Sequence, residues 1–241
     1  MTDEASGVSG FQLTDSGASR YERFVAALML PFIEAVIQAT VCWGDRVLDV
    51  ACGTGFATRA AATAVGPGGT VAAVDVNVAM LDEARRHGPG VVDWQEASAL
   101  QLPFPDAEFD SVICQQGVQF FPDPVAGLAE MLRVLKPGGR AGVTVWAPIG
   151  RSPYLAAQSQ VLGGALGSAS SIGDVACPPG GEPALLAWAA RAGWTDPQVV
   201  AIEQTIHLPN VESHIPNHLS TLPWSAPFFA LPPADQTVAI G

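Results

Sequence analysis

Charged residues are scarce in this sequence, and basic residues are the scarcer of the two signs. Charged residues make up 14% of the 241 residues, and the 11 Lys and Arg against 23 Asp and Glu give a net charge of −12. A chain this acidic has no basic stripe that could neutralise a phosphate backbone or an anionic membrane surface. We therefore expect a small molecule as the ligand, and neither nucleic acid nor a membrane as a partner.

Cysteine is also rare, and its spacing does not indicate a metal or redox site. The four cysteines stand at positions 42, 52, 114 and 177, without a C-x-x-C pair. This usage is typical of reduced thiols in a cytosolic protein. Cys52 lies beside Gly53, but no base is near it in the sequence, so we expect a buried thiol and not a nucleophile.

No stretch of the sequence is long and apolar enough to suggest a membrane span. The longest apolar stretch, Phe24 to Ile37, is interrupted by Pro31 and Glu34, and it falls short of the ~20 residues that a span needs. The first 19 residues contain acidic side chains and no basic segment before an apolar run, unlike a secretory signal. We therefore expect a soluble, cytoplasmic protein.

The most informative pattern is a strand, a turn of small residues and a helix, followed by an acidic residue at the end of the next strand. Residues 47–55 read Val-Leu-Asp-Val-Ala-Cys-Gly-Thr-Gly, and Asp75 follows the apolar run 70–74. Gly53 and Gly55 let the turn bend and let its backbone approach a ligand closely. A carboxylate at position 75 can accept hydrogen bonds from two ribose hydroxyls. The pattern predicts a nucleoside site.

Apolar runs alternate with helical segments along the chain. The predicted strands are 46–50, 70–74, 91–95, 110–114, 140–146 and 199–208. Such a pattern is typical of an α/β fold with a doubly wound, mostly parallel sheet that helices cover on both faces. Residues 1–18 are predicted to be unstructured, and a helix is expected from Ser19 through Phe32.

Three segments of one domain are expected. Residues 1–40 are an N-terminal segment with a cap helix, residues 41–150 are the ligand-binding core, and residues 151–241 contain a lid insertion, strand six and a C-terminal tail. The lid is the Gly, Ser and Pro rich stretch 167–181.

Further fragments give the chain a resemblance to a known family. They are Leu-Pro-Phe-Pro-Asp at 102–106, Phe-Asp at 109–110, Gln-Gln-Gly-Val-Gln-Phe-Phe-Pro-Asp at 115–123 and Arg-Val-Leu-Lys-Pro-Gly-Gly at 133–139. Together with residues 49–55 and Asp75, this order resembles the class I S-adenosylmethionine-dependent methyltransferases. The branch that it resembles is the methyltransferase type 11-like, small-molecule branch, which includes the ubiquinone and menaquinone biosynthesis methyltransferases. The resemblance covers roughly residues 20–150.

The resemblance implies an enzyme with a Rossmann-like core that binds S-adenosyl-L-methionine and releases S-adenosyl-L-homocysteine. It implies methyl transfer to a small, largely apolar molecule, such as a quinone precursor, a polyketide or a terpenoid of secondary metabolism. Transfer would be an in-line SN2 displacement that positioning catalyses. A monomer or a homodimer is expected.

The resemblance also implies where the cofactor binds. The turn after the first strand would surround the methionine part, Asp75 would take the ribose hydroxyls, and the last three residues in this list would border the sulfonium and the substrate. The implied cofactor residues are Asp49, Ala51, Gly53, Gly55, Asp75, Val76, Met80, Ser98, Ala99, Cys114, Gln115 and Gln116.

Three departures from the family pattern stand out. Ala51 replaces the first glycine of the turn, and Ser98 replaces an Asp that accepts a hydrogen bond from the adenine amino group. A hydroxyl is a weaker acceptor than a carboxylate. The third departure is the end of the sheet: after strand six only proline-broken segments follow, so the usual last antiparallel strand is expected to be lacking or truncated.

No fixed catalytic dyad is visible, which fits a reaction that depends on alignment. His207 and Tyr21 are weak candidates for a catalytic role, and the expected substrate pocket consists of Tyr21, Gln119, Trp146 and Tyr154. His214 and His218 have the i, i+4 spacing of a metal pair. Pro216 lies between them and no carboxylate follows at ligand spacing, so exposed histidines are the favoured interpretation and no metal is expected.

Two other functions are open at this point. A nicotinamide-dependent oxidoreductase would also use Asp75 for a ribose, but Thr58 stands where the dinucleotide pattern needs a third small residue. The second alternative is a methyltransferase-like fold that binds cofactor or substrate without methylating, as a rearrangement catalyst or a binding protein.

Overall fold

A computed structural model of the chain describes residues 13, 15–166, 181–205, 207, 211–222 and 226–240. None of the helices in these residues combines the length and the apolar character needed to cross a membrane. The elements, in chain order, are α1 (Asp15–Phe24), η1 (Ala26–Met29), α2 (Leu30–Thr40), β1 (Arg46–Val50), α3 (Phe56–Val65), η2 (Gly66–Gly68), β2 (Thr70–Asp75), α4 (Val78–His87), β3 (Asp93–Glu96), β4 (Phe109–Gln115), η3 (Val118–Phe120), α5 (Pro124–Val134), β5 (Leu135–Thr144), η4 (Ile149–Arg151), α6 (Pro153–Leu166), α8 (Gly181–Arg191), α9 (Val211–Leu219), α10 (Ala226–Phe229) and α11 (Pro233–Ile240).

The five strands form one parallel sheet in the order β3-β2-β1-β4-β5. The central strand β1 pairs with β2 on one side and with β4 on the other, so that Val47 lies between Val71 and Ser111. Successive strands lead from β1 first to one edge of the sheet and then to the other, as in a doubly wound fold. The predicted Rossmann-like α/β architecture is confirmed.

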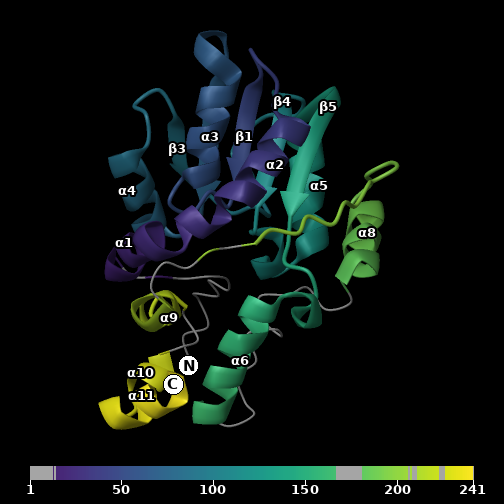
Figure 1. Cartoon of the computed structure of the whole chain (residues 1–241). Coiled ribbons are helices and arrows are strands. Elements are labelled where there is room, and N and C mark those ends of the chain that lie inside the picture. Colours follow the sequence, from purple (N-terminus) through teal and green to yellow (C-terminus); the bar gives the residue numbers. More distant parts are fainter. Residues whose placement is uncertain are drawn as a thin grey trace, which may run out of the picture.

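Both faces of the sheet are covered, because β1, β2 and β4 are apolar on both sides. On one face, α2, α3 and Leu81 of α4 pack against Val47, Val71 and Ile113. On the other face, α5 packs against a second set of strand residues that includes Leu48 and Val112. Trp194, which follows α8, donates its indole N–H to the carbonyl of Leu128 in α5 at 3.0 Å, so α8 lies beside α5 (Figure 1).

Side chains at the helix starts fix where two of these helices begin. Asp123 accepts hydrogen bonds from the backbone N–H groups of Val125 and Ala126 at 2.9 and 3.0 Å, and Pro124 occupies the first helical position of α5. Asn77 caps α4 in the same way. These caps satisfy N–H groups that have no partner within the helix.

The N-terminal part differs from the expectation. Helix α1 begins at Asp15, within the segment that was predicted to be unstructured, and the expected helix from Ser19 through Phe32 is broken by η1. Pro31 lies in the first turn of α2. A proline is tolerated there because the N–H groups of a first turn have no partner within the helix, so the chain starts a new helix instead of extending the first.

The predicted sixth strand is not found in the described residues. Residues 199–205 lie outside the sheet, and Val200 is 77% exposed. An alternating run of apolar residues does not specify which strand of a sheet it would pair with. Whether such a run forms a strand therefore depends on its tertiary contacts. Among the described residues, no strand follows β5. Residues 167–180 of the predicted lid (167–181) lie outside the described residues, as do Cys177 and Trp224, and Gly181 begins α8.

A helical cap lies beyond the carboxyl ends of the strands. We use this name for α6, α9, α10 and α11, which gather at the end of the sheet toward which β5 points (Figure 1). The cap has an apolar core of its own, formed by Leu155, Leu162, Leu219 and Phe228. The cap therefore forms a roof over the edge of the sheet where ligands bind in folds of this kind.

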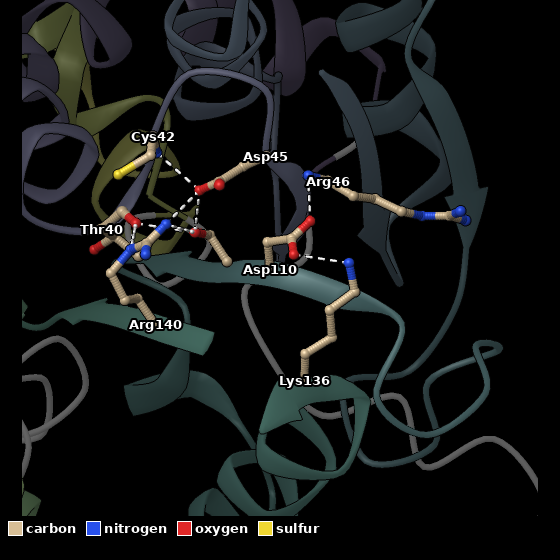
Figure 2. A network of polar contacts seen from close by, with 8 residues as sticks. Thr40, Cys42, Asp45, Arg46, Asp110, Lys136 and Arg140 are labelled. Carbon is tan, nitrogen blue, oxygen red and sulfur yellow. Dashed lines mark hydrogen bonds and ion pairs between the residues drawn. The ribbon is translucent and has the colours of Figure 1, made fainter. Parts of the chain in front are cut away.

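A polar network holds the opposite, amino-terminal edge of the sheet (Figure 2). Asp45, just before β1, accepts hydrogen bonds from the Cys42 N–H, the Ser111 hydroxyl and the Arg140 guanidinium at 2.8, 2.6 and 2.6 Å. Nearby, Lys136 pairs with Asp110 at 2.7 Å. Burial raises the pKa of Asp45, but the three hydrogen bonds outweigh it and lower the pKa overall. The network joins α2, β1, β4 and β5.

We predict that Asp45→Ala lowers the free energy of unfolding by about 2 kcal/mol, because three donors lose a charged acceptor. Chemical denaturation measures this change. The control is Asp82→Ala, which removes an ion pair whose carboxylate side chain is 52% exposed and should change stability by less than about 0.5 kcal/mol. Equal effects of the two substitutions would contradict the structural role of Asp45.

Candidate functional site

A cavity of about 530 Å³ lies where the loops after β1 and β4 diverge, at the carboxyl edge of the sheet. Its walls come from these loops, the ends of β2 and β3, helix α1 and the cap. Such a crevice at the reversal of strand order is the usual ligand site of a doubly wound sheet. The residues predicted from the sequence that line it are Tyr21, Asp49, Ala51, Gly53, Asp75, Val76, Met80, Ser98, Ala99, Gln115, Gln116, Trp146 and Tyr154.

The turn after β1 is held in a conformation that few residues other than glycine adopt. The φ angles of Ala51, Gly53 and Gly55 are 58°, 54° and 84°. Ala51 therefore carries the strain of a left-handed alanine at the first position of the turn. The Cys52 N–H donates to the Val74 carbonyl at 3.0 Å, which ties the turn to β2.

Gly55 packs against a neighbouring side chain and is not among the residues that line the cavity. A Cβ at this position would lie 2.7 Å from the ring of Trp94, so only glycine allows the start of α3 to approach that side chain. Gly55 is the residue before α3. Gly55 is predicted from the sequence to surround the ligand. In the structure it supports the turn from behind, through its contact with Trp94.

Asp75 lies at the end of β2 and connects the two loops of the site. Its Oδ2 accepts from the Gly53 N–H at 2.8 Å, and its Oδ1 accepts from the Asn77 N–H at 2.8 Å. Burial raises its pKa, and hydrogen bonds from the backbone of Asn77, Gly53 and Val76 act in the opposite direction. Each oxygen keeps lone-pair capacity toward the cavity.

Asp49, at the end of β1, is a fully buried carboxylate. Its Oδ2 accepts from the Thr58 hydroxyl at 2.6 Å, while its Oδ1 has no partner among the described residues. Burial, and next the negative charge of Asp75, raise the pKa of Asp49 to about 7. Thr58 argues against a dinucleotide pattern in the sequence, and in the structure it also holds one oxygen of this acid.

The two carboxylates face a cavity without a cationic side chain, since none of its described lining residues is Lys or Arg. Buried carboxylates in such surroundings are costly unless a positive group or hydrogen-bond donors compensate them. The arrangement therefore suits a ligand that carries a positive charge next to groups that donate hydrogen bonds.

Helix α1 lies across this part of the cavity, and side-chain contacts connect it to both α3 and α4. Glu22 pairs with Arg59 of α3 at 2.8 Å, and Ser19 donates to Glu83 of α4 at 2.9 Å. Tyr21 of α1 lines the cavity, and burial, followed by the charges of Asp75 and Glu22, raises its pKa to about 12. Tyr21 is therefore a neutral phenol at physiological pH.

The ends of β2 and β3 form a more apolar wall. Met80 is 3% exposed and Ala99 is 8% exposed. The Ser98 hydroxyl accepts from the Leu100 N–H at 3.2 Å, which leaves its own proton free to donate. Glu96 and Leu100 also line this wall, although no sequence motif points to either residue.

The loop after β4 brings glutamines to the cavity. Gln116 has a φ of 55°, a strained value that is common at functional sites. Gln119 donates to the Gln116 side chain at 2.9 Å and lies behind it, outside the lining. Cys114 is fully buried and does not line the cavity, and burial raises its pKa to about 12. The thiol is therefore protonated at neutral pH.

The cap contributes polar residues that the sequence analysis missed. His218 is 5% exposed and Gln158 is 1% exposed, and both line the cavity beside Tyr154. The interpretation of His218 as an exposed histidine is wrong, because α9 packs this face against α6. The sequence contains a pattern that predicts the burial of Gln158. Leu155, Gln158 and Leu162 have the spacing of residues on one face of a helix, and the two leucines mark that face as the buried one.

Burial sets the protonation of these cap residues. Burial, followed by the charge of His214, lowers the pKa of His218 to about 4. Burial raises the pKa of Tyr154 well above its usual value, so the phenol stays protonated. In the described part of the chain, no three His, Cys, Asp or Glu side chains are placed to share a metal ion. His207 is exposed and lies outside the cavity.

Comparisons with known proteins agree with this geometry. The family model described as "Methyltransferase domain" matches residues 48–143, from β1 to the end of the sheet. A 2-phytyl-1,4-naphtoquinone methyltransferase of Synechococcus elongatus is 43% identical over 105 residues, which are 42% of this chain and 45% of that protein. The ubiquinone/menaquinone biosynthesis C-methyltransferase of Ectopseudomonas mendocina is 43% identical over 118 residues, which are 47% of this chain and 46% of that protein.

Among solved structures, a SAM-dependent methyltransferase of Thermotoga maritima superposes with a TM-score of 0.56. It is 21% identical and covers 74% of this chain and 78% of that one, so it supports the fold. The chain spans about half the length of the curated relatives that it matches. The resemblance that the sequence motifs predicted is confirmed for the sheet and its loops.

We predict that Asp49→Asn stabilises the protein without ligand at pH 8, by up to about 4 kcal/mol, and has little effect at pH 4. An unfolded Asp titrates near 3.9, whereas the folded value is about 7. Between these values the folded state binds more protons than the unfolded state, so stability falls as the pH rises and stays lower above the folded pKa. Asn removes this loss and can still accept from Thr58.

Thermal unfolding of both proteins from pH 4 to pH 8 checks this. The difference in Tm should grow up to the folded pKa and then level off. A difference that does not vary with pH would argue against an uncompensated carboxylate at this position. Asp82→Asn, on the exposed side of α4, serves as the control that should show no such trend.

Proposed function

We propose that this chain, whose residues 48–143 match the methyltransferase domain, transfers a methyl group from S-adenosyl-L-methionine to a small, largely apolar acceptor of the quinone-precursor kind. The observation that carries the proposal is a pair of carboxylates, the fully buried Asp49 and the partly buried Asp75, which face an apolar cavity without a cation among its described residues. S-adenosylmethionine supplies both a positive charge and hydroxyl donors. A location in the cytoplasm and a monomeric or homodimeric state belong to the same proposal.

The residues of the site fit this cofactor. The unpartnered Oδ1 of Asp49 suits the ammonium group of the methionine part, and the free lone pairs of Asp75 suit the two ribose hydroxyls. Met80 and Val76 offer apolar contact to the adenine ring. Ser98 can donate its hydroxyl proton to an adenine nitrogen, which is a weaker tie than the carboxylate that the family pattern has in its place.

The reaction needs little beyond alignment. The bound cofactor supplies a methyl group that is already activated by its positive sulfur. The protein must hold an acceptor in line with the bond that breaks and keep water away, and such positioning can supply roughly 7 to 11 kcal/mol in well-oriented cases. The apolar side chains that can do this come from three parts of the chain: Leu28 in η1, Phe120 in η3 and Leu222 after α9.

The acceptor class follows from the cavity and from the named relatives. The lining offers aromatic and aliphatic contact and no cationic side chain among its described residues, so an anionic acceptor would be poorly compensated. The relatives in Synechococcus and Ectopseudomonas carry names that refer to naphthoquinone and to ubiquinone or menaquinone. A neutral aromatic or isoprenoid-bearing acceptor fits both observations.

Two measurements test the proposal. Calorimetry with S-adenosylhomocysteine should show saturable binding of one molecule per chain. Labelled methyl groups should then pass from S-adenosylmethionine to reduced 1,4-naphthoquinone acceptors. Binding without transfer to any acceptor would favour the alternative of a methyltransferase-like protein that does not methylate. Absence of binding would overturn the proposal itself.

We predict that Asp75→Ala weakens S-adenosylhomocysteine binding at least tenfold, because a charged acceptor for two hydroxyls is lost. The matched control is Glu96→Ala at the end of the neighbouring strand β3. Glu96 is an exposed carboxylate that also lines the cavity, and its removal should change affinity less than threefold. Similar losses in both variants would mean that only the general negative charge of the cavity matters.

A further inference from the structure

Three polar side chains form a cluster on the cap wall of the cavity. We call Tyr154 and Gln158 of α6, together with His218 of α9, the cap cluster. The Tyr154 hydroxyl is hydrogen-bonded to Nδ1 of His218, and the Gln158 amide nitrogen lies 3.0 Å from the same atom. The rings of Tyr154 and His218 stack at 5.4 Å. The cluster is therefore ordered by contacts between two helices that are distant in the sequence.

This cluster is separate from the groups that the proposed cofactor uses. The latter come from the ends of β1, β2 and β3, whereas the cap cluster comes from α6 and α9. Both sets line the same cavity. The cap cluster is therefore available to the second ligand, the methyl acceptor.

Gln158 shows what kind of group would bind. Its side chain is 1% exposed, and its Oε1 has no hydrogen-bond partner among the described residues. A buried acceptor without a partner costs free energy that a donor from a ligand would restore. The acceptor molecule should therefore carry a hydrogen-bond donor at this wall.

The cap cluster has no charged side chain, and this favours a neutral hydroxyl as the donor group of the ligand. The cluster contains a phenol, an amide and an imidazole and no carboxylate, so it has no counter-charge for a protonated amine. It also contains no Lys or Arg for a carboxylic acid. A hydroxyl can donate to Gln158 or to the oxygen of Tyr154, and the apolar walls suit the ring that carries it.

We propose that the cap cluster recognises a hydroxyl group on an aromatic acceptor, and that Tyr154 and His218 together take the proton of that hydroxyl during methyl transfer. The inference rests on the proposed function and narrows the acceptor to phenols and hydroquinones.

The proton moves in two coupled steps. With the imidazole proton on Nε2, the Tyr154 hydroxyl donates to Nδ1, so the phenol oxygen of Tyr154 faces the acceptor as a hydrogen-bond acceptor. The acceptor O–H bond breaks and its proton passes to Tyr154, while the proton of Tyr154 passes to His218. The electron pair left on the acceptor forms the new bond to the methyl carbon, and the pair of the broken sulfur–methyl bond stays on sulfur.

The charge of the cavity balances in this step. The sulfur loses its positive charge when the methyl group leaves, and His218 gains one as an imidazolium. Before the reaction the imidazole is neutral at pH 7, because burial lowers its pKa to about 4. The lowered pKa makes this imidazole a weak base, so it takes the proton only as the positive charge of the sulfur disappears, and the net charge inside the cavity is unchanged.

A binding experiment tests recognition without relying on methyl transfer. The probes are 1-naphthol and 1-methoxynaphthalene, which differ in the hydroxyl proton. The wild-type chain should prefer 1-naphthol by about tenfold. Tyr154→Phe and Gln158→Leu should each reduce this preference severalfold, while Gln160→Leu, on the exposed side of the same helix, should leave it intact. A preference that survives in both cap variants would overturn the proposal, whatever the methylation assay shows.

A transfer experiment tests the proton step. Tyr154→Phe and His218→Gln should bind S-adenosylhomocysteine within twofold of the wild type but transfer methyl groups about a hundredfold more slowly to an unsubstituted naphthol. With acceptors of falling pKa, such as nitro-substituted naphthols, the deficit should shrink, because an acid that ionises by itself needs no base. A deficit equal for all acceptors would refute proton transfer and leave a packing role. Loss of cofactor binding in the wild type would instead count against the proposed function.

Discussion

The hydrogen bond from the Gly53 N–H to Asp75 joins the two strands on which the site is built. It connects the turn after β1 to the end of β2, so the position of the carboxylate and the shape of the turn depend on each other. The strained φ of Ala51 and the packing of Gly55 on Trp94 are tolerated because this contact, and the one between Cys52 and Val74, hold the turn in place. Contacts within the chain therefore set the shape of this side of the cavity.

Charge is distributed along the strands in a way that supports this site. Three of the 11 basic residues lie at the amino edge of the sheet, where Arg140, Lys136 and Arg46 pair with Asp45, Asp110 and Glu108. The carboxyl edge has Asp49 and Asp75 without such partners in the described lining. The protein thus stabilises one end of its sheet by ion pairs and leaves the other end negative, at a cost in stability that a cationic ligand would offset.

The sequence predicts the parts of the fold and site that depend on local pattern. β1 is found at its predicted limits, and the residues of the turn and of β2 lie together because parallel strands end at one edge. The failures concern residues whose surroundings come from distant segments. Burial of His218 depends on α6 packing against α9, and the absence of a strand at 199–205 depends on what the edge of β5 offers. His207, which seemed to end a strand, is exposed for the same reason.

Trp146 belongs to two hydrophobic cores. It packs against the core between α2, α3 and the sheet, with its ring 5.7 Å from Phe32, and also against the core of the cap. The loop from 145 to 152 is the direct link from the sheet to α6, so a hinge motion of the cap would pivot near this side chain. The sheet side of the cavity would then keep its dimensions while the cap side opens or closes. Such an arrangement would keep the sheet side of the cavity rigid for one ligand while the cap side adapts to ligands of different size.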